Sequence, residues 1–113
     1  MKLQLFVVLV VVLMSYADAR KMSYDDWSPI EDINDPHVTD IANFAVTEFN
    51  KQTGAKLRFE KVIKGESQVA DGTNYRLTLS TSNSVPNIFE AVVNEKSWEH
   101  VRNLTSFIPI KHD

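Results

Sequence analysis

The clearest pattern of apolar and polar positions runs from Asp35 to Gly54. Apolar side chains recur at Val38, Ile41, Ala42, Ala45 and Phe49, and polar ones at Asp40, Asn43, Thr47 and Asn50. At the helical period the apolar set falls within an arc of about 100°, the width of a core-facing stripe, and the polar set falls opposite, toward water. The pattern therefore predicts one amphipathic helix of about four turns.

Both ends of this helix carry their own signals. Asp35 is a good N-cap, because its carboxylate accepts from backbone N–H groups left unpaired in the first turn, and Pro36 suits the first helical position. Gly54 lets the chain turn away at little steric cost. No second stretch within residues 20–113 repeats the pattern, so we expect the helix to lie against a sheet.

Alternation of period two predicts the strands of that sheet. Residues 56–64 alternate in part and slip between Phe59 and Val62, which indicates a bulge or a change of face. Residues 65–73 are polar and turn-like. Further strands are expected over residues 74–80, 88–95 and 104–110, of which the second carries Phe89, Ala91 and Val93 on one face and follows a Ser/Asn/Pro loop at 81–87.

The first nineteen residues have the three parts of a secretory signal. A basic residue (Lys2) is followed by an apolar run (3–14) and a small-residue ending (17–19). Because the run is too short for a membrane span, we expect cleavage after residue 19 and a secreted single domain covering residues 20–113; an uncleaved anchor is the alternative.

In a secreted chain, Asn103-Leu104-Thr105 is an acceptor triplet for N-glycosylation. The triplet lies at the start of a predicted strand. A glycosylated and an unmodified Asn103 therefore both stay open.

Composition excludes several classes of function. Removing the signal takes away one basic and one acidic residue, so the formal charge of the remainder stays at −3. This mild acidic balance leaves no electrostatic footprint for nucleic acid or an anionic membrane. The chain has no cysteine, which excludes a thiol enzyme and a cysteine-based metal site, and the domain must be held by its core alone.

Catalysis has little support in the sequence. His37, His100 and His112 lie far apart, without metal-ligand spacing or an accompanying nucleophile motif. The adjacent acids Asp25-Asp26 and Glu31-Asp32 are expected to be solvated. The sequence therefore predicts neither an enzyme nor a cofactor.

Three stretches resemble the plant cystatins, the phytocystatins. Residues 41–50 (Ile-Ala-Asn-Phe-Ala-Val-Thr-Glu-Phe-Asn) are similar to the helix signature of that family, with Asn43 where a charged residue is usual. Trp27-Ser28-Pro29-Ile30 resembles the start of its first strand, and residues 68–75 resemble its first hairpin. The resemblance runs from about Trp27 to Phe107, and the absence of cysteine agrees with the plant branch. With one strand before the helix and four after it, we expect an α+β, cystatin-like fold: one α-helix packed across a five-stranded antiparallel meander sheet.

The first hairpin tip in plant cystatins most often reads Gln-Val-Val-Ala-Gly. This chain keeps Gln68, Val69 and Gly72, whereas Ala70 replaces the central Val and Asp71 a small neutral residue. A rigid tip of small apolar side chains can enter a narrow cleft without offering a peptide bond in attack geometry, and Gly72 supplies a backbone state that other residues resist. Locally, Asp71-Gly72 indicates an ordinary hairpin turn as well, and we expect the Asp71 carboxylate to be solvated in the free protein.

The resemblance implies two further contact elements. Trp98 stands where the family carries a Trp at the tip of a second hairpin, but Ser97 replaces the usual Pro, so this loop is less pre-ordered. The alternative is that Trp98 folds back onto the sheet edge. Near the N-terminus, Asp25 and Asp26 occupy the place of a common Gly pair and would have to be desolvated or paired on binding.

Together these elements imply a monomeric inhibitor of papain-like cysteine proteases that acts by reversible, competitive occlusion of the active-site cleft. The N-terminal segment, the first hairpin and Trp98 would form one wedge, with no covalent step or cofactor. Departures in all three elements favour an alternative of another class, a cystatin-fold binding or storage protein with weak or lost inhibition.

Overall fold

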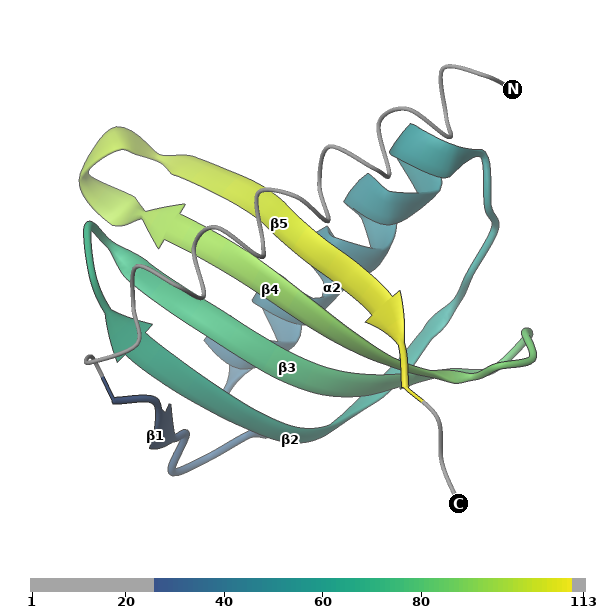
Figure 1. Cartoon of the computed structure of the whole chain (residues 1–113), viewed down its shortest axis with the longest axis horizontal. Helices are drawn as coiled ribbons and strands as arrows, with labels where there is room; N and C mark the ends of the chain where they lie inside the picture. The colour runs from purple at the N-terminus through teal and green to yellow at the C-terminus, as the bar shows by residue number, and fades with distance from the viewer. Residues whose placement is uncertain (1–25, 111–113) are drawn as a thin grey trace.

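One long helix lies across one face of a five-stranded antiparallel sheet in the computed structural model, which describes residues 26–110 (Figure 1). In chain order the elements are β1 (Ser28–Pro29), α2 (Pro36–Thr53), β2 (Phe59–Val69), β3 (Thr73–Thr81), β4 (Ile88–Lys96), a 3-10 turn (Ser97–Glu99) and β5 (Val101–Pro109). The strands neighbour one another in sequence order, so the predicted α+β meander is confirmed. The expected signal and Asp25 lie outside the described residues. Among residues 26–110, no helix is long and apolar enough to cross a membrane.

Local chemistry fixes both ends of α2 as predicted. The Asp35 carboxylate accepts from the His37 N–H at 2.8 Å, and Pro36 occupies the first turn. At the other end, Gly54 is left-handed with φ 80°, and its N–H donates to the Asn50 carbonyl at 2.8 Å. These contacts satisfy backbone groups that a helix end leaves unpaired.

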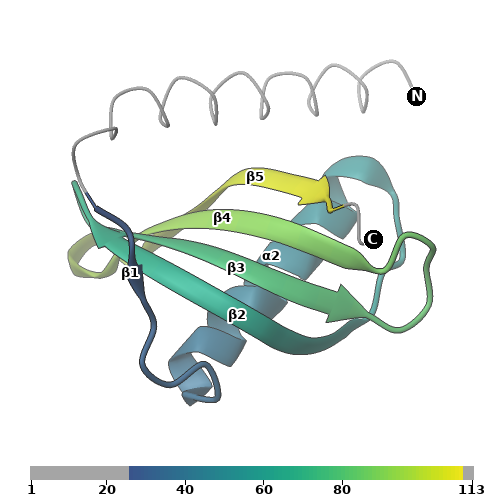
Figure 2. The same cartoon turned by 60° about the horizontal axis from the view of Figure 1, so that its bottom comes forward.

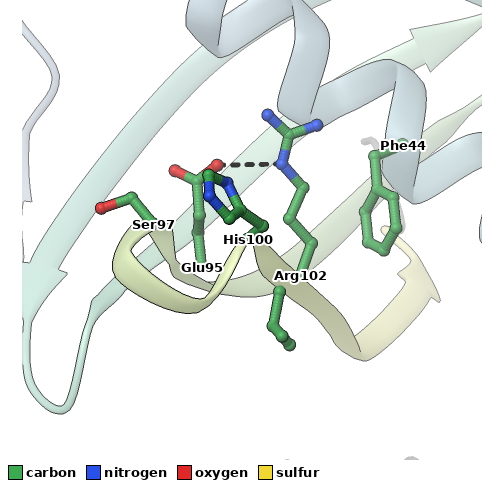
Figure 3. Close-up of a pocket in the computed structure, with 6 residues that line it drawn as sticks. Phe44, Glu95, Ser97, His100 and Arg102 are labelled. Atoms are coloured by element: carbon green, nitrogen blue, oxygen red, sulfur yellow. Dashed lines mark hydrogen bonds and ion pairs between the residues drawn. The ribbon is translucent and has the colours of Figure 1, made fainter.

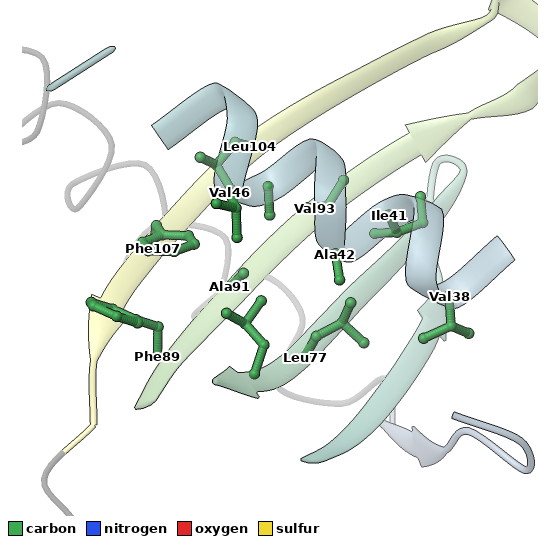
Figure 4. Packing of buried hydrophobic residues seen from close by; sticks show 12 residues of the cluster. Val38, Ile41, Ala42, Val46, Leu77, Phe89, Ala91, Val93, Leu104 and Phe107 are labelled. Atoms are coloured by element: carbon green, nitrogen blue, oxygen red, sulfur yellow. The ribbon is translucent and has the colours of Figure 1, made fainter. Parts of the chain in front are cut away.

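The buried face of the helix is wider than the predicted stripe. Four of the five predicted residues, Val38, Ile41, Ala42 and Ala45, are buried, and Val46 is buried as well (Figure 4). Phe49 is only partly buried, and its ring stacks on Phe107 with centroids 4.3 Å apart. Because the sheet curves around the helix, side chains on both flanks of the stripe meet it. From the sheet, the core receives Leu77, Leu79, Phe89, Ala91, Val93, Leu104 and Phe107, which confirms the predicted face of β4.

The prediction that Asn50 faces water was wrong. Its side chain bonds both backbone groups of Leu57, donating to the carbonyl at 3.0 Å and accepting from the N–H at 3.1 Å. The amide thus ties the last turn of the helix to the segment that follows it.

The polar stretch over residues 65–73, predicted as a turn, forms one only over residues 70–72, because β2 continues to Val69 and β3 begins at Thr73. The side chains in this last part of β2 are mostly polar, but its backbone pairs with a strand on each side. β1 pairs with Ser67, the Ile30 N–H donates to the Gly65 carbonyl at 3.0 Å, and β3 pairs along the other side. The predicted slip near Phe59 is confirmed by two register shifts in this strand.

The last strand begins at Val101, three residues earlier than predicted. Its first residues pair with the end of β4, including Val101 with Lys96 and Arg102 with Glu95. Since this part of the strand has no apolar alternation, the sequence pattern did not reveal it.

Three segments meet at one end of the sheet. The turn between β2 and β3, the turn between β4 and β5, and the chain entering β1 lie there, whereas the loop between β3 and β4 lies at the opposite end (Figures 1 and 2). We call the first end, formed by Asp26, residues 68–72 and residues 97–100, the hairpin edge.

Candidate functional site: the hairpin edge

The first hairpin turns through two residues with positive φ. Asp71 has φ 47° and Gly72 has φ 100°, which is the requirement of the primed turns that join twisted strands. Asp is one of the few residues with a side chain that tolerate this region. A side chain at Gly72 is excluded for a second reason, because its Cβ would lie 2.5 Å from the Glu95 carbonyl oxygen. The first hairpin tip is therefore pressed against the backbone of β4.

The structure separates the predicted contact residues of this tip into exposed and buried ones. Val69 is 85% exposed, whereas Ala70 and Gly72 are half-buried. Gln68 is only 3% exposed and accepts from Asn74 Nδ2 at 3.2 Å, so it lies behind the tip rather than on it. Its position indicates support of the hairpin from within the sheet.

The expectation of a solvated Asp71 carboxylate is confirmed, but the carboxylate also has a charged partner. The side chain is 79% exposed, yet its Oδ2 atom lies 3.1 Å from Lys96 Nζ. Lys96 ends β4 and leads into the second hairpin tip, and sheet register brings it beside the first turn. The two hairpins therefore share an ion pair at their tips.

Trp98 stands out from the second hairpin tip. The residue is 63% exposed in the 3-10 turn, so it does not fold back onto the sheet edge as the alternative proposed. His100 closes the turn with φ 55°. Val69 and Trp98 thus present apolar side chains from two adjacent hairpins at the same edge.

The chain entering β1 is fixed at the same end. The Trp27 ring lies over the Arg76 guanidinium, 4.3 Å from centroid to Cζ, and Arg76 bonds Glu66 through Nε and Nη2 at 2.8 and 2.6 Å. Such cation–π contacts hold an aromatic side chain against a sheet surface. Asp26, directly before Trp27, is exposed, and it precedes the pair of Ser28 and Ser67 that joins β1 to the end of β2.

A charged network supports the second hairpin from the helix side. The Glu95 carboxylate lies 2.9 Å from Arg102 Nε (Figure 3) and 2.7 Å from His37 Nε2, and Arg102 Nη2 also lies 2.8 Å from Asp40. The contact between His37 and Glu95 spans 58 positions in the sequence, so no local pattern could have revealed it.

Burial and charge oppose each other in this network. Burial alone would raise the pKa of Glu95, but the hydrogen bonds and charges of His37 and Arg102 outweigh it and leave the pKa below its ordinary value. Burial would likewise lower the pKa of Arg102, yet the bonds to Glu95 and Asp40 raise it. The neighbouring Tyr75 has a raised pKa, first through burial and then through the Glu95 charge. The network therefore holds Glu95 and Arg102 ionised.

An open hollow of about 570 Å³ lies between this network and the helix. Its lining is mixed in character, and consists of Phe44, Glu95, Ser97, His100, Val101 and Arg102 (Figure 3). Within residues 26–110, no three His, Cys, Asp or Glu side chains are grouped so as to hold a metal ion.

Exposed aromatic and aliphatic side chains on a rigid backbone, as at Val69 and Trp98, are typical of a protein-contact surface.

Comparisons with known proteins agree with this architecture. Residues 30–110 match a family described as aspartic acid proteinase inhibitor. The chain is 44% identical over 103 residues to cysteine proteinase inhibitor 5 of Arabidopsis thaliana, covering 89% of this chain and 84% of the relative. It is 45% identical over 89 residues to cysteine proteinase inhibitor 1 of Actinidia chinensis var. chinensis, with coverages of 78% and 77%.

A third relative, cysteine proteinase inhibitor 8 of Oryza sativa subsp. japonica, is 44% identical over 85 residues, with coverages of 74% and 69%. These relatives are named as proteinase inhibitors and not as enzymes, in agreement with the expectation from the sequence. Fold, hairpin edge and relatives together place the chain in the plant cystatin family, the phytocystatins.

Proposed function

We propose that the chain is a reversible, competitive inhibitor of papain-like cysteine proteases that blocks the active-site cleft with the hairpin edge. The observation that carries this proposal is the joint exposure of Val69 and Trp98 on two adjacent, interlocked hairpins. Relatives named as cysteine proteinase inhibitors supply the class of partner.

In the proposed complex, the first hairpin tip enters the cleft and Trp98 packs on its rim. Val69 and the half-buried Ala70 offer small apolar surface. Trp98 buries a large area with few rotatable bonds, which is typical of residues that dominate binding energy. The inhibitor would place no scissile peptide in attack geometry, so the mechanism needs neither a covalent step nor a cofactor.

The N-terminal segment with Asp25 and Asp26 would supply the third contact. The Trp27–Arg76 contact supports this assignment, because it holds the chain beside the first hairpin tip. Affinity would then come from a preformed edge that loses little conformational freedom on binding.

Titration of an active-site-counted papain-like protease with residues 20–113 tests the proposal. We expect stoichiometric inhibition by a monomer, relieved competitively by substrate, with Trp98→Ala weaker and the loop variant Val85→Ala unchanged. Val85 is an exposed residue at the opposite end of the sheet, and therefore a matched control. No inhibition across a panel of such proteases would instead favour the cystatin-fold binding or storage protein.

A second candidate function is inhibition of aspartic proteases, favoured by the family matched over residues 30–110. The same panel separates the two candidates if it includes a pepsin-like enzyme. Inhibition of that enzyme by wild type and its loss in Trp98→Ala would assign both activities to one edge. Retention in Trp98→Ala would place the aspartic-protease contact elsewhere on the surface.

We further propose that the protein is secreted after cleavage behind residue 19 and that Asn103 carries a glycan. Asn103 is exposed on β5, a strand at the edge of the described sheet, which supports access to its side chain. Expression through a eukaryotic secretory pathway, followed by mass measurement before and after enzymatic deglycosylation, tests both points. Asn103→Gln provides the control for the site.

A further inference from the structure

Side-chain amides form a row directly behind the first hairpin tip. Gln68, Asn74 and Asn94 face one another on β2, β3 and β4, as the sheet register pairs Gln68 with Asn74 and Asn74 with Asn94. Asn74 Nδ2 donates to Gln68 Oε1 at 3.2 Å, and Asn94 Nδ2 donates to Asn74 Oδ1 at 2.8 Å. Gln68 and Asn74 are buried, so the row is part of the sheet interior near this end.

Asn94 also contacts the turn between β2 and β3. Its Nδ2 atom donates to the Asp71 carbonyl at 3.3 Å, across 23 positions of sequence. An amide nitrogen has two N–H donors, and here one serves the row and the other serves the turn. Strand β4, the first strand of the second hairpin, thus binds the peptide group between Asp71 and Gly72.

This contact acts on a part of the backbone with an uncommon conformation. Asp71 is in the left-handed region, which few residues with a side chain other than Asn and Asp adopt. The other side-chain link between the two hairpins at this point is the exposed pair of Asp71 and Lys96. Exposed ion pairs contribute little to stability and are screened by salt. The bond from Asn94 to the Asp71 carbonyl is exposed as well, but it joins two uncharged groups and is therefore not screened by salt.

We propose that Asn94 is a positioning residue of the hairpin edge, which presets the first hairpin tip in its protease-binding conformation. The inference rests on the proposed inhibitory function. Holding the Asp71 peptide before binding removes part of the conformational entropy that a free turn would lose in the complex. Asn94 itself lies behind the tip, so it acts through the turn and does not contact the protease.

The test compares Asn94→Leu with Asn103→Leu. Leu resembles Asn in shape but has no donor, and Asn103 lies directly opposite Asn94 on β5. Both variants are made in bacteria so that Asn103 carries no glycan. Asn94→Asp, which keeps the shape and removes the donors, is the second variant if Asn94→Leu folds poorly.

Two readouts separate positioning from general stabilisation. The first is the inhibition constant against one papain-like protease, which we expect to rise about tenfold in Asn94→Leu and less than about twofold in Asn103→Leu. The second is amide exchange of Ala70 in the free protein, whose N–H donates to the Gly72 carbonyl at 3.0 Å across the turn. This exchange should accelerate in Asn94→Leu alone.

Three results would overturn the inference. Asn94→Leu that inhibits within twofold of wild type would show that the turn keeps its shape unaided, and would leave the proposed function intact. Equal weakening in both variants, with unchanged Ala70 exchange, would assign the effect to general sheet stability. Absence of inhibition by wild type would contradict the proposed function itself. This result is distinct from the other two, because the wild-type protein is measured before any variant is compared with it.

Discussion

The Asp71 carboxylate and the Lys96 ammonium group lie 3.1 Å apart and link the tips of the two hairpins in the free protein. A carboxylate that enters a protease cleft must lose water, and this loss is offset only by a donor or cation. Lys96 supplies such a cation to Asp71 from within the same chain. The departure from the small neutral residue usual in the family is therefore accommodated within the chain.

Neutralising Asp71 and neutralising Lys96 should have opposite effects on the inhibition constant. Asp71→Asn keeps a residue suited to positive φ but removes the charge that must be desolvated, so we expect tighter inhibition of papain-like proteases. Lys96→Gln leaves Asp71 without its cation, so we expect weaker inhibition. Unfolding free energies should stay within about 1 kcal/mol of wild type, because the pair is exposed. Inhibition constants at two salt concentrations measure both effects, and changes of the same sign would contradict the argument.

Restoring the usual Val at position 70 should strengthen binding. Ala70→Val adds apolar surface equivalent to about two methylene groups, and its burial in the cleft is worth about 1.5 kcal/mol, or roughly tenfold in the inhibition constant. Val69→Ala removes similar surface at the neighbouring exposed position and should weaken inhibition. Unchanged constants in both variants would mean that this tip stays outside the cleft.

Phe49 stabilises the fold rather than the hairpin edge. Its ring stacks on Phe107 and tilts against Phe89, but it is only partly buried. We expect Phe49→Ala to lower the free energy of unfolding by about 2–3 kcal/mol, at or below the lower end for a fully buried ring. Urea unfolding measures this loss, with the exposed Thr47→Ala on the same helix as a control expected within about 0.5 kcal/mol. A loss below about 1 kcal/mol would mean that the stacked rings contribute little.

Glu95 should make the fold sensitive to acid. Its pKa in the folded protein lies below the ordinary value of 4.5, so the carboxylate is stabilised by folding. This stability is present above the ordinary pKa and is lost as the pH falls through the folded pKa. The free energy of unfolding should differ less between about pH 7 and about pH 3 in Glu95→Gln than in wild type. Glu99→Gln, an exposed carboxylate on the second hairpin tip, should keep the wild-type difference, and equal behaviour of the two variants would contradict this role.

Much of the fold follows from interactions between residues close in sequence. The cap at Asp35, the proline after it and the left-handed Gly54 define α2 because a helix end is satisfied within about one turn of chain. Alternation of period two likewise placed Phe89 and Val93 on the core face of β4, because successive side chains of a strand point to opposite sides. The family resemblance located the two hairpin tips by the same kind of short pattern.

Only the tertiary structure decided which residues work together at those tips. Gln68 looked like a contact residue, but sheet register turns it inward to Asn74. Asp71 pairs with Lys96, and Glu95 pairs with His37, and no local sequence pattern encodes either contact. Such pairs depend on strand register and on where the helix crosses the sheet. Those in turn are set by the burial of the whole apolar face, a property of the assembled core rather than of any one segment.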